Sequence, residues 1–144
     1  MAQDAIALLE SDHQRVETLF RDFQSSRADL TLKFDIAQII CMELTMHSTL
    51  EEELFYPAFA KASGEEDMVK KAQDDHQAVK ELIAQVPTAP QLDAIVKLII
   101  DDTLSHIQEE RLALFPKARS CGMDLEALGE QIERRKAEFA VQAA

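Results

Sequence analysis

Apolar side chains recur at three- and four-residue steps along most of the chain, which is the spacing of amphipathic α-helices. The pattern predicts four main helices over residues 4–24, 29–62, 65–86 and 91–119, followed by a shorter polar helix from Asp124 to about Ala140. Short connections between long helices are typical of antiparallel bundles. We therefore predict an all-α fold, an up-down-up-down four-helix bundle with a short extra C-terminal helix, in a single domain spanning residues 1–144.

Turn-forming residues mark where these helices end. Ser63 and Gly64 are typical of a helix end, and residues 86–90, with the sequence Val-Pro-Thr-Ala-Pro, predict a turn. The apolar stripe of the second helix is expected to face the core, and it includes Phe34, Ile36, Ile39, Ile40 and Leu44.

The two halves of the bundle repeat each other. Residues 12–14, Asp-His-Gln, return 63 positions later as residues 75–77. A second set returns 59 positions later: His47, Glu51 and Pro57 correspond to His106, Glu110 and Pro116. The first two helices are therefore echoed by the next two, which predicts a pseudo-twofold arrangement of two helical hairpins.

The charge balance excludes some partners. Lysine and arginine total 15 residues against 27 aspartate and glutamate residues, so the formal net charge is −12. A surface this acidic repels the phosphates of nucleic acids and of anionic lipids, so we expect neither partner. The hydrophobic share of 47% is that of a folded domain rather than a disordered chain.

Nothing in the chain reads as a targeting or membrane segment. Acidic residues interrupt the first apolar positions, and the apolar stretch at residues 95–100 is far too short to span a bilayer. Cys41 and Cys121 lie far apart without a CxxC pattern, so we expect free, reduced thiols. We predict a cytoplasmic protein.

The repeat carries the candidate chemistry. It contains every histidine of the chain, one on each main helix, and a glutamate follows two of them by four positions; the set is His13, His47, His76, His106, Glu51 and Glu110. Residues four apart face the same side of a helix, so these groups are expected to converge in the bundle. Ionised carboxylates in an apolar core lose several kcal/mol of hydration unless they gain a partner.

A metal pair is the partner that fits this donor set. Four imidazoles and two carboxylates are too many donors for one tetrahedral zinc ion. They suit two ions, each held by two imidazoles and sharing both carboxylates, with coordination positions left open. This mixture of donors favours non-haem iron, with manganese second.

Other polar residues near the histidines are expected to play lesser roles. Asp12, Asp75, Glu43 and Asp102 are predicted to lie at the surface or to orient a ligating imidazole.

Aromatic and proline residues near the second donor helix are expected to be structural. Tyr56 is predicted to pack beneath Pro57, and Pro57 and Pro116 are predicted only to bend the ends of their helices.

At these residues the sequence resembles the hemerythrin/HHE cation-binding family, over about residues 4–118. The resemblance rests on Asp12-His13, on His47 to Glu51 through Phe55-Tyr56-Pro57, and on the corresponding residues of the second hairpin. It implies two non-haem iron ions, oxo- or hydroxo-bridged, with manganese less expected. His13 and His47 would hold one iron, His76 and His106 the other, and Glu51 and Glu110 would bridge them.

Two positions depart from the oxygen-carrying members of that family. Ala72 stands where they have a further histidine, and Glu110 follows the last histidine by four positions, where they have an aspartate at five. One iron therefore lacks an expected protein ligand, which argues against reversible oxygen carriage. The donor set is also similar to that of di-iron proteins implicated in iron–sulfur cluster repair.

Three functions follow from this interpretation. The leading one is a di-iron protein that binds or senses a small diatomic ligand, oxygen or nitric oxide, at open iron positions. The second is a stress or repair protein, or an enzyme, that works with a redox partner in peroxide or nitric oxide chemistry or donates iron. The third is structural: the metal only holds the bundle together, or the acidic bundle is an interaction module. The C-terminal helix would either dock on the bundle or mediate a dimer.

Overall fold

The computed structural model describes residues 3–26, 29–86 and 91–143, and these ranges contain helices and no strand. Its elements, in chain order, are α1 (Ala5–Ser25), α2 (Leu30–Leu50), the π-helical turn η1 (Glu51–Phe55), α3 (Tyr56–Ser63), α4 (Glu66–Ile83), α5 (Leu92–Glu109), the π-helical turn η2 (Glu110–Leu114), α6 (Phe115–Ser120) and α7 (Leu125–Ala143). The predicted all-α fold is confirmed. Most of the turn expected at residues 86–90 lies outside the described residues.

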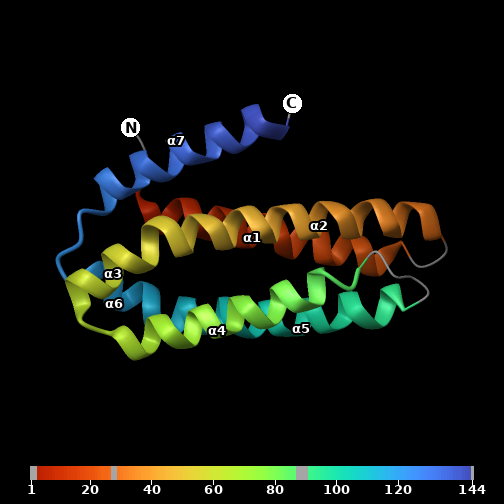
Figure 1. Ribbon diagram of the computed structural model, residues 1–144, viewed down its shortest axis with the longest axis horizontal. Coiled ribbons are helices and arrows are strands. Elements are labelled where there is room, and N and C mark those ends of the chain that lie inside the picture. The colour runs from red at the N-terminus through yellow and green to blue at the C-terminus, as the bar shows by residue number, and fades with distance from the viewer. Residues whose placement is uncertain (1–2, 27–28, 87–90, 144) are drawn as a thin grey trace.

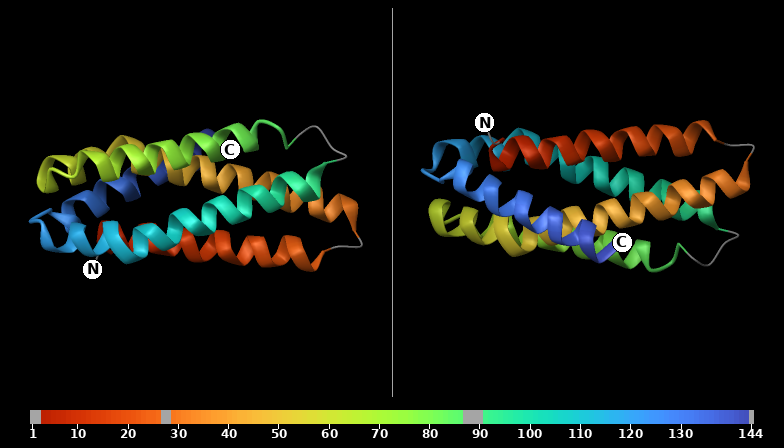
Figure 2. Two further views of the ribbon diagram at one scale, coloured as in Figure 1. Left: turned by 90° about the horizontal axis from the view of Figure 1, so that it is seen from below. Right: turned by 90° about the horizontal axis from the view of Figure 1, so that it is seen from above.

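The main helices form two hairpins that lie side by side (Figure 1). α2, η1 and α3 follow one another without a break, as do α5, η2 and α6. α1 packs along α2, and α4 packs along α5. Both views in Figure 2 show that neighbouring long helices of the bundle run antiparallel, so the up-down-up-down bundle of two hairpins is confirmed.

Aspartate side chains fix where three helices begin. Oδ1 of Asp4 accepts a hydrogen bond from the backbone N–H of Ala7 at 2.8 Å, and Asp29 caps α2 in the same way. Asp124 accepts from the N–H of Ala127 at the start of α7. Each cap satisfies an N–H that the first helical turn leaves unpaired. Gly64 ends α3 in the left-handed conformation, with φ of 74°.

The apolar core consists of two clusters. One, around Phe55, Phe59 and Leu9, lies at the end of the bundle near α3, α6 and α7. The other, around Phe20, Ile40 and Ile99, fills the opposite end. Ile39 was expected in the core but is 40% exposed, because it lies about 100° around the helix from Ile40, which is buried on the inward face of α2.

The continuous helices α2–η1–α3 and α5–η2–α6 each contain a π-helical turn that the sequence interpretation did not predict. In both turns the backbone N–H five positions after a glutamate bonds back to it: Tyr56 N–H to Glu51 O, and Phe115 N–H to Glu110 O. Pro57 and Pro116 follow immediately, and the helix continues past them. The two prolines therefore do more than bend the helix ends, because each lies directly after a widened turn.

The C-terminal helix docks on the bundle, which is one of the two roles that the sequence left open. α7 contacts α1, α2 and η1, and its side chains Leu128 and Ile132 are buried. Gly129 meets the backbone of residues 3–5 so closely that a Cβ would overlap the carbonyl oxygen of Gln3. Figure 2 shows that α7 covers the α1–α2 hairpin and leaves the α4–α5 hairpin uncovered. Within the described ranges, no helix is both long and apolar enough to span a membrane.

Candidate metal centre

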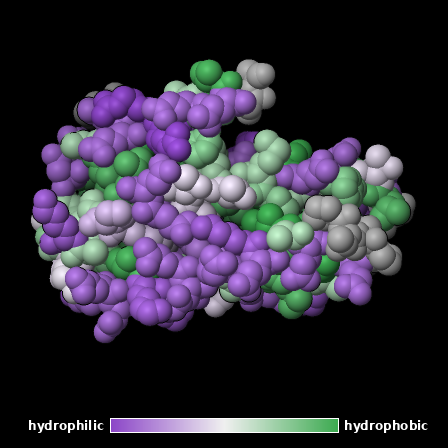
Figure 3. All heavy atoms as spheres, viewed as in Figure 1, coloured by the Kyte–Doolittle hydropathy of each residue, from purple (hydrophilic) through white to green (hydrophobic). Residues whose placement is uncertain are grey.

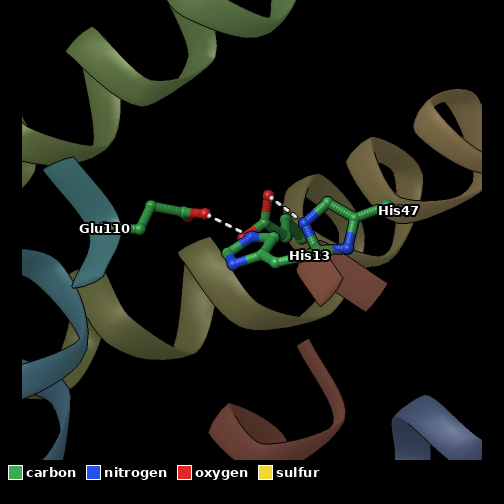
Figure 4. A group of neighbouring side chains, drawn as sticks. His13, His47 and Glu110 are labelled. Carbon is green, nitrogen blue, oxygen red and sulfur yellow. Dashed lines mark ion pairs between the residues drawn. The ribbon is translucent and has the colours of Figure 1, made fainter. Parts of the chain in front are cut away.

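The predicted donor residues converge in the middle of the bundle, between the two apolar clusters. Nε2 of His13 lies 3.1 Å from Oε1 of Glu110, and Nε2 of His47 lies 3.2 Å from Oε1 of Glu51. Figure 4 shows the His13 ring between the carboxylate of Glu110 and the ring of His47. One donor atom from each of these four residues lies within 4.8 Å of the others, which is close enough to share an ion.

A second group of donors adjoins the first. Nε2 of His76 lies 3.1 Å from Oε1 of Glu51 and 3.2 Å from Nε2 of His106. Oε1 of Glu110 lies 3.5 Å from Nε2 of His106. Both carboxylates therefore reach both histidine pairs, as groups that bridge two ions would have to do.

Burial sets the electrostatics of this cluster. Glu51 is fully buried and Glu110 is 1% exposed. Burial raises the pKa of Glu51, but the charge of His47 and the neighbouring imidazoles outweigh it and hold that pKa well below its usual range. Burial and the charge of Glu51 raise the pKa of Glu110. Burial lowers the pKa of His106, yet both glutamates bring it up to about 9.

Four atoms of the donor cluster lack hydrogen bonds, which fits a metal. Among the described residues, no hydrogen-bond partner exists for Nε2 of His13, Nε2 of His47, Oε2 of Glu51 or Oε1 of Glu110. Nitrogen and oxygen atoms nevertheless approach one another to 3.1 and 3.2 Å. Donors about 2.1 Å from a shared ion lie about 3 Å apart when they occupy adjacent coordination positions. An ion between them would satisfy all of these atoms.

An aspartate orients one histidine of each pair. Oδ2 of Asp12 accepts from Nδ1 of His47 at 3.0 Å, and Oδ2 of Asp75 accepts from Nδ1 of His106 at 3.0 Å. These contacts fix the tautomer that leaves Nε2 free for a metal. The other two candidates do not contribute such a contact: Glu43 pairs with Arg15, and Asp102 is exposed.

Tyr56 lies inside the donor cluster, so its predicted role of packing beneath Pro57 was wrong. The phenol oxygen lies 2.9 Å from Oε2 of Glu110 and 3.2 Å from Oε1 of Glu51. It is also 3.2 Å from Nε2 of both His76 and His106. These separations are those expected among ligands of one ion, so Tyr56 is a fifth candidate donor on the His76–His106 side.

The π-helical turn is the reason for this placement. In a regular α-helix a residue five positions after Glu51 would point about 140° away from it. The wider turn of η1 brings Tyr56 back to the same side as Glu51. Phe115 occupies the equivalent position after Glu110, and its ring stacks on His13 at 5.6 Å. A proline repeated six residues after each glutamate was the sequence feature that could have indicated these turns.

Two cavities adjoin the cluster. A small one of about 20 Å³ is bordered by all four histidines, and also by Leu44 and Thr103. A larger one of about 210 Å³ lies beside Ala72, with His106 and Glu110 on its wall and the exposed residues Asp67 and Glu109 at its rim. The position that lacks a histidine is therefore a space that leads from the surface to the donors.

Comparisons with known proteins agree with this architecture. The hemerythrin HHE cation-binding domain family matches residues 4–118. A DNA nickase from Nostoc sp. (strain PCC 7120 / SAG 25.82 / UTEX 2576) is 30% identical over 141 residues, which cover 95% of this chain but only 37% of that protein. The crystal structure of a hemerythrin HHE cation-binding domain-containing protein from Mycobacterium kansasii matches with a TM-score of 0.83 and 21% identity, covering 98% of this chain and 90% of that chain.

The structural likeness supports the helical fold, and the family match spans both hairpins together with every donor position described above. The chain therefore belongs to the hemerythrin HHE cation-binding domain family, whose members bind metal cations.

Proposed function

We propose that this chain is a non-haem di-iron protein that binds or senses a small diatomic ligand, oxygen or nitric oxide. The observation that carries the proposal is the cavity of about 20 Å³ bordered by all four histidines of the donor cluster. A space of this size holds about one water molecule. A diatomic ligand in this space would lie directly beside both histidine pairs.

The proposed metal ligands are the six residues predicted from the repeat, together with Tyr56. His13 and His47 would hold one ion, while His76, His106 and Tyr56 would hold the other, and Glu51 and Glu110 would bridge the two. Imidazole and carboxylate donors of this kind suit iron better than zinc, with manganese second. Bound iron would supply open coordination positions and redox chemistry for the ligand.

The unequal halves of the site support a specialised role for each ion. Tyr56 offers a phenol oxygen to the His76–His106 side, whereas Phe115 presents only a ring face to His13. The His13–His47 side therefore has fewer protein donors and keeps more open positions. We expect a diatomic ligand to bind on that side, next to the small cavity.

The test is the metal content per chain, measured with the absorption spectrum before and after anaerobic reduction and again after exposure to each gas. About two irons per chain with a spectrum that responds reversibly to oxygen or nitric oxide is the expected result. Stoichiometric zinc with no redox-linked spectrum would contradict the di-iron assignment. If the chain holds about two irons but its spectrum responds to neither gas, the di-iron assignment stands and the proposed binding of a diatomic ligand is contradicted.

A second candidate function is stress or repair chemistry, in which the site turns over peroxide or nitric oxide or donates iron. The cavity of about 210 Å³ beside Ala72 favours it, because that cavity connects the exterior with His106 and Glu110. Sustained turnover with a defined oxidant and reductant, or rapid transfer of iron to a chelator, would favour this function over simple binding.

DNA cleavage, named for the relative from Nostoc, is not part of the proposal. The chain corresponds to 37% of that protein's length. Its net charge of −12 opposes contact with a phosphate backbone. Hydrophilic residues cover the face over α4 in Figure 3, and the rim of the larger cavity there includes the acidic residues Asp67 and Glu109.

A further inference from the structure

Thr103 carries a buried hydroxyl that no described residue satisfies. The residue lies on α5, one turn before His106, and is 5% exposed. Its Oγ1 has no hydrogen-bond partner among the described residues. Buried hydroxyls are nearly always bonded, because an unpaired one loses its hydrogen bonds to water and gains none in return. The exception therefore calls for a physical reason.

Two other helical threonines of this chain satisfy their hydroxyls locally. Oγ1 of Thr18 donates to the carbonyl oxygen of Gln14 at 3.1 Å, and Oγ1 of Thr49 donates to that of Thr45 at 2.8 Å. This backbone contact is open to any threonine within an α-helix. Thr103 lies well inside α5, yet its hydroxyl does not make the contact.

Thr103 belongs to the wall of the small histidine-lined cavity. Thr103 borders the space of about 20 Å³ together with the four histidines, and apolar side chains form much of the remaining wall; these are Val16, Leu44, Val79 and Ile107. The residue that corresponds to Thr103 in the first hairpin, 59 positions earlier, is Leu44. Ser48 and Asp75 also border the cavity, and Ser48 corresponds to Ile107 in the second hairpin. Of the two hydroxyl-bearing residues, Thr103 is the one whose buried hydroxyl lacks a hydrogen-bond partner among the described residues.

We propose that Thr103 donates a hydrogen bond to the small ligand held in this cavity and thereby selects ligands that carry an acceptor atom. The inference rests on the proposed function and deepens it. Oxygen and nitric oxide both have an acceptor atom at the end away from the metal, whereas a purely apolar guest of the same size does not.

Thr103→Val is the decisive variant, because it replaces the hydroxyl with a methyl group of similar size. With nitric oxide as the probe on the reduced, iron-loaded protein, we expect the dissociation rate to rise about tenfold. The N–O stretching frequency in the infrared spectrum is expected to rise, since the hydrogen bond that weakens that bond is lost. Thr103→Ser, which keeps the hydroxyl, should restore both values toward those of the wild type.

A second readout needs no metal. In chemical denaturation of the metal-free chain, Thr103→Val is expected to have a higher midpoint than the wild type, because it removes an unsatisfied buried hydroxyl. Thr45→Val, the same change at an exposed position of α2, is the matched control and should leave the nitric oxide kinetics and frequency unchanged.

The outcomes separate the two proposals. Wild-type protein with full iron that binds neither gas would overturn the proposed function and this inference with it. Wild-type protein that binds nitric oxide, with Thr103→Val showing the same dissociation rate and stretching frequency, would overturn only the role of Thr103.

Discussion

Oδ2 of Asp12 on α1 lies 3.0 Å from Nδ1 of His47 on α2, and the pair recurs as Asp75 and His106 in the second hairpin. The two contacts differ in their surroundings. Asp12 is buried, and its other oxygen, Oδ1, accepts a hydrogen bond from Nζ of Lys136 on α7 at 2.5 Å. The buried carboxylate of Asp12 therefore connects Lys136 of α7 with His47 of the donor cluster.

Replacing that carboxylate should weaken metal binding. Asp12→Asn removes the charge that holds the His47 tautomer, and changes of this kind typically cost about 10- to 100-fold in metal affinity. We expect a loss in this range, measured by competition with a chelator. Glu43→Gln is the control, since Glu43 pairs with Arg15 away from the cluster. Equal affinities for the wild type and Asp12→Asn would show that the contact does not orient the ligand.

The phenol of Tyr56 should strengthen binding on the side of His76 and His106. Tyr56→Phe keeps the ring but removes the oxygen that lies 3.2 Å from both histidines. We expect this variant to hold less iron, approaching one ion per chain under limiting iron, because that ion loses a donor. Phe115→Tyr offers a phenol to the opposite side and should not reproduce the loss. Metal analysis after gel filtration distinguishes the two variants.

The convergence of the donor residues could be predicted from the sequence because their spacing is a helical property. His47 and Glu51 stand four positions apart, and the same spacing recurs 59 residues later, so both pairs had to face inward in any bundle of two equal hairpins. The position of Tyr56 could not be predicted this way. It depends on a π-helical turn, which shifts the periodicity by one residue and leaves no mark in the apolar pattern.

Tertiary packing decided the features that periodicity left open. The sequence of α7 allowed either docking or dimerisation, and the close approach of Gly129 to the backbone of residues 3–5 is a contact between distant segments. Ile39 was misplaced for a related reason. Ile39 matches the stripe in composition, but it lies about 100° around α2 from Ile40, on the side away from the buried Ala37.

Gly129 should control the docking of α7. A Cβ at this position would overlap the carbonyl oxygen of Gln3, which is backbone and cannot move aside as a side chain could. We expect Gly129→Ala to lower the thermal midpoint and to raise the rate of amide hydrogen exchange along α7. The amides in the four main helices of the bundle should remain protected from exchange. Alanine has the higher helix propensity, so propensity alone would stabilise α7 in Gly129→Ala; Ala127→Gly, the reverse change at an exposed position of the same helix, measures the size of that opposing effect. Unchanged exchange in α7 would contradict the packing argument.

Asp4 should make the stability of the chain depend on acid pH. Burial raises the pKa of Asp4, but the N–H of Ala7 and the guanidinium of Arg119 outweigh it and hold the pKa below the ordinary value of 3.8. A depressed pKa means that the ionised carboxylate stabilises the fold above pH 3.8. The contribution is lost as the pH falls through the lower pKa of the folded state.

Asp4→Asn isolates this contribution, because asparagine also caps helices but carries no charge. We expect the wild type to be the more stable of the two near pH 6, with the difference shrinking as the pH falls from 4 toward 2. Urea denaturation of the metal-free proteins at a series of pH values measures it. A difference that stays constant across this range would mean that the charge of Asp4 contributes nothing.

Ala72 is the position at which the donor set can be enlarged. It lies on α4, one helical turn before His76, and borders the cavity of about 210 Å³ that reaches His106 and Glu110. Ala72→His should place an imidazole in that space without overpacking the core. We expect tighter metal binding, seen as slower loss of iron to a chelator, because the added nitrogen offers the His76–His106 ion a further donor. Ala72→Leu fills the same space without a donor atom. If both variants slow the loss of iron equally, closing the cavity rather than adding a ligand is what retains the metal.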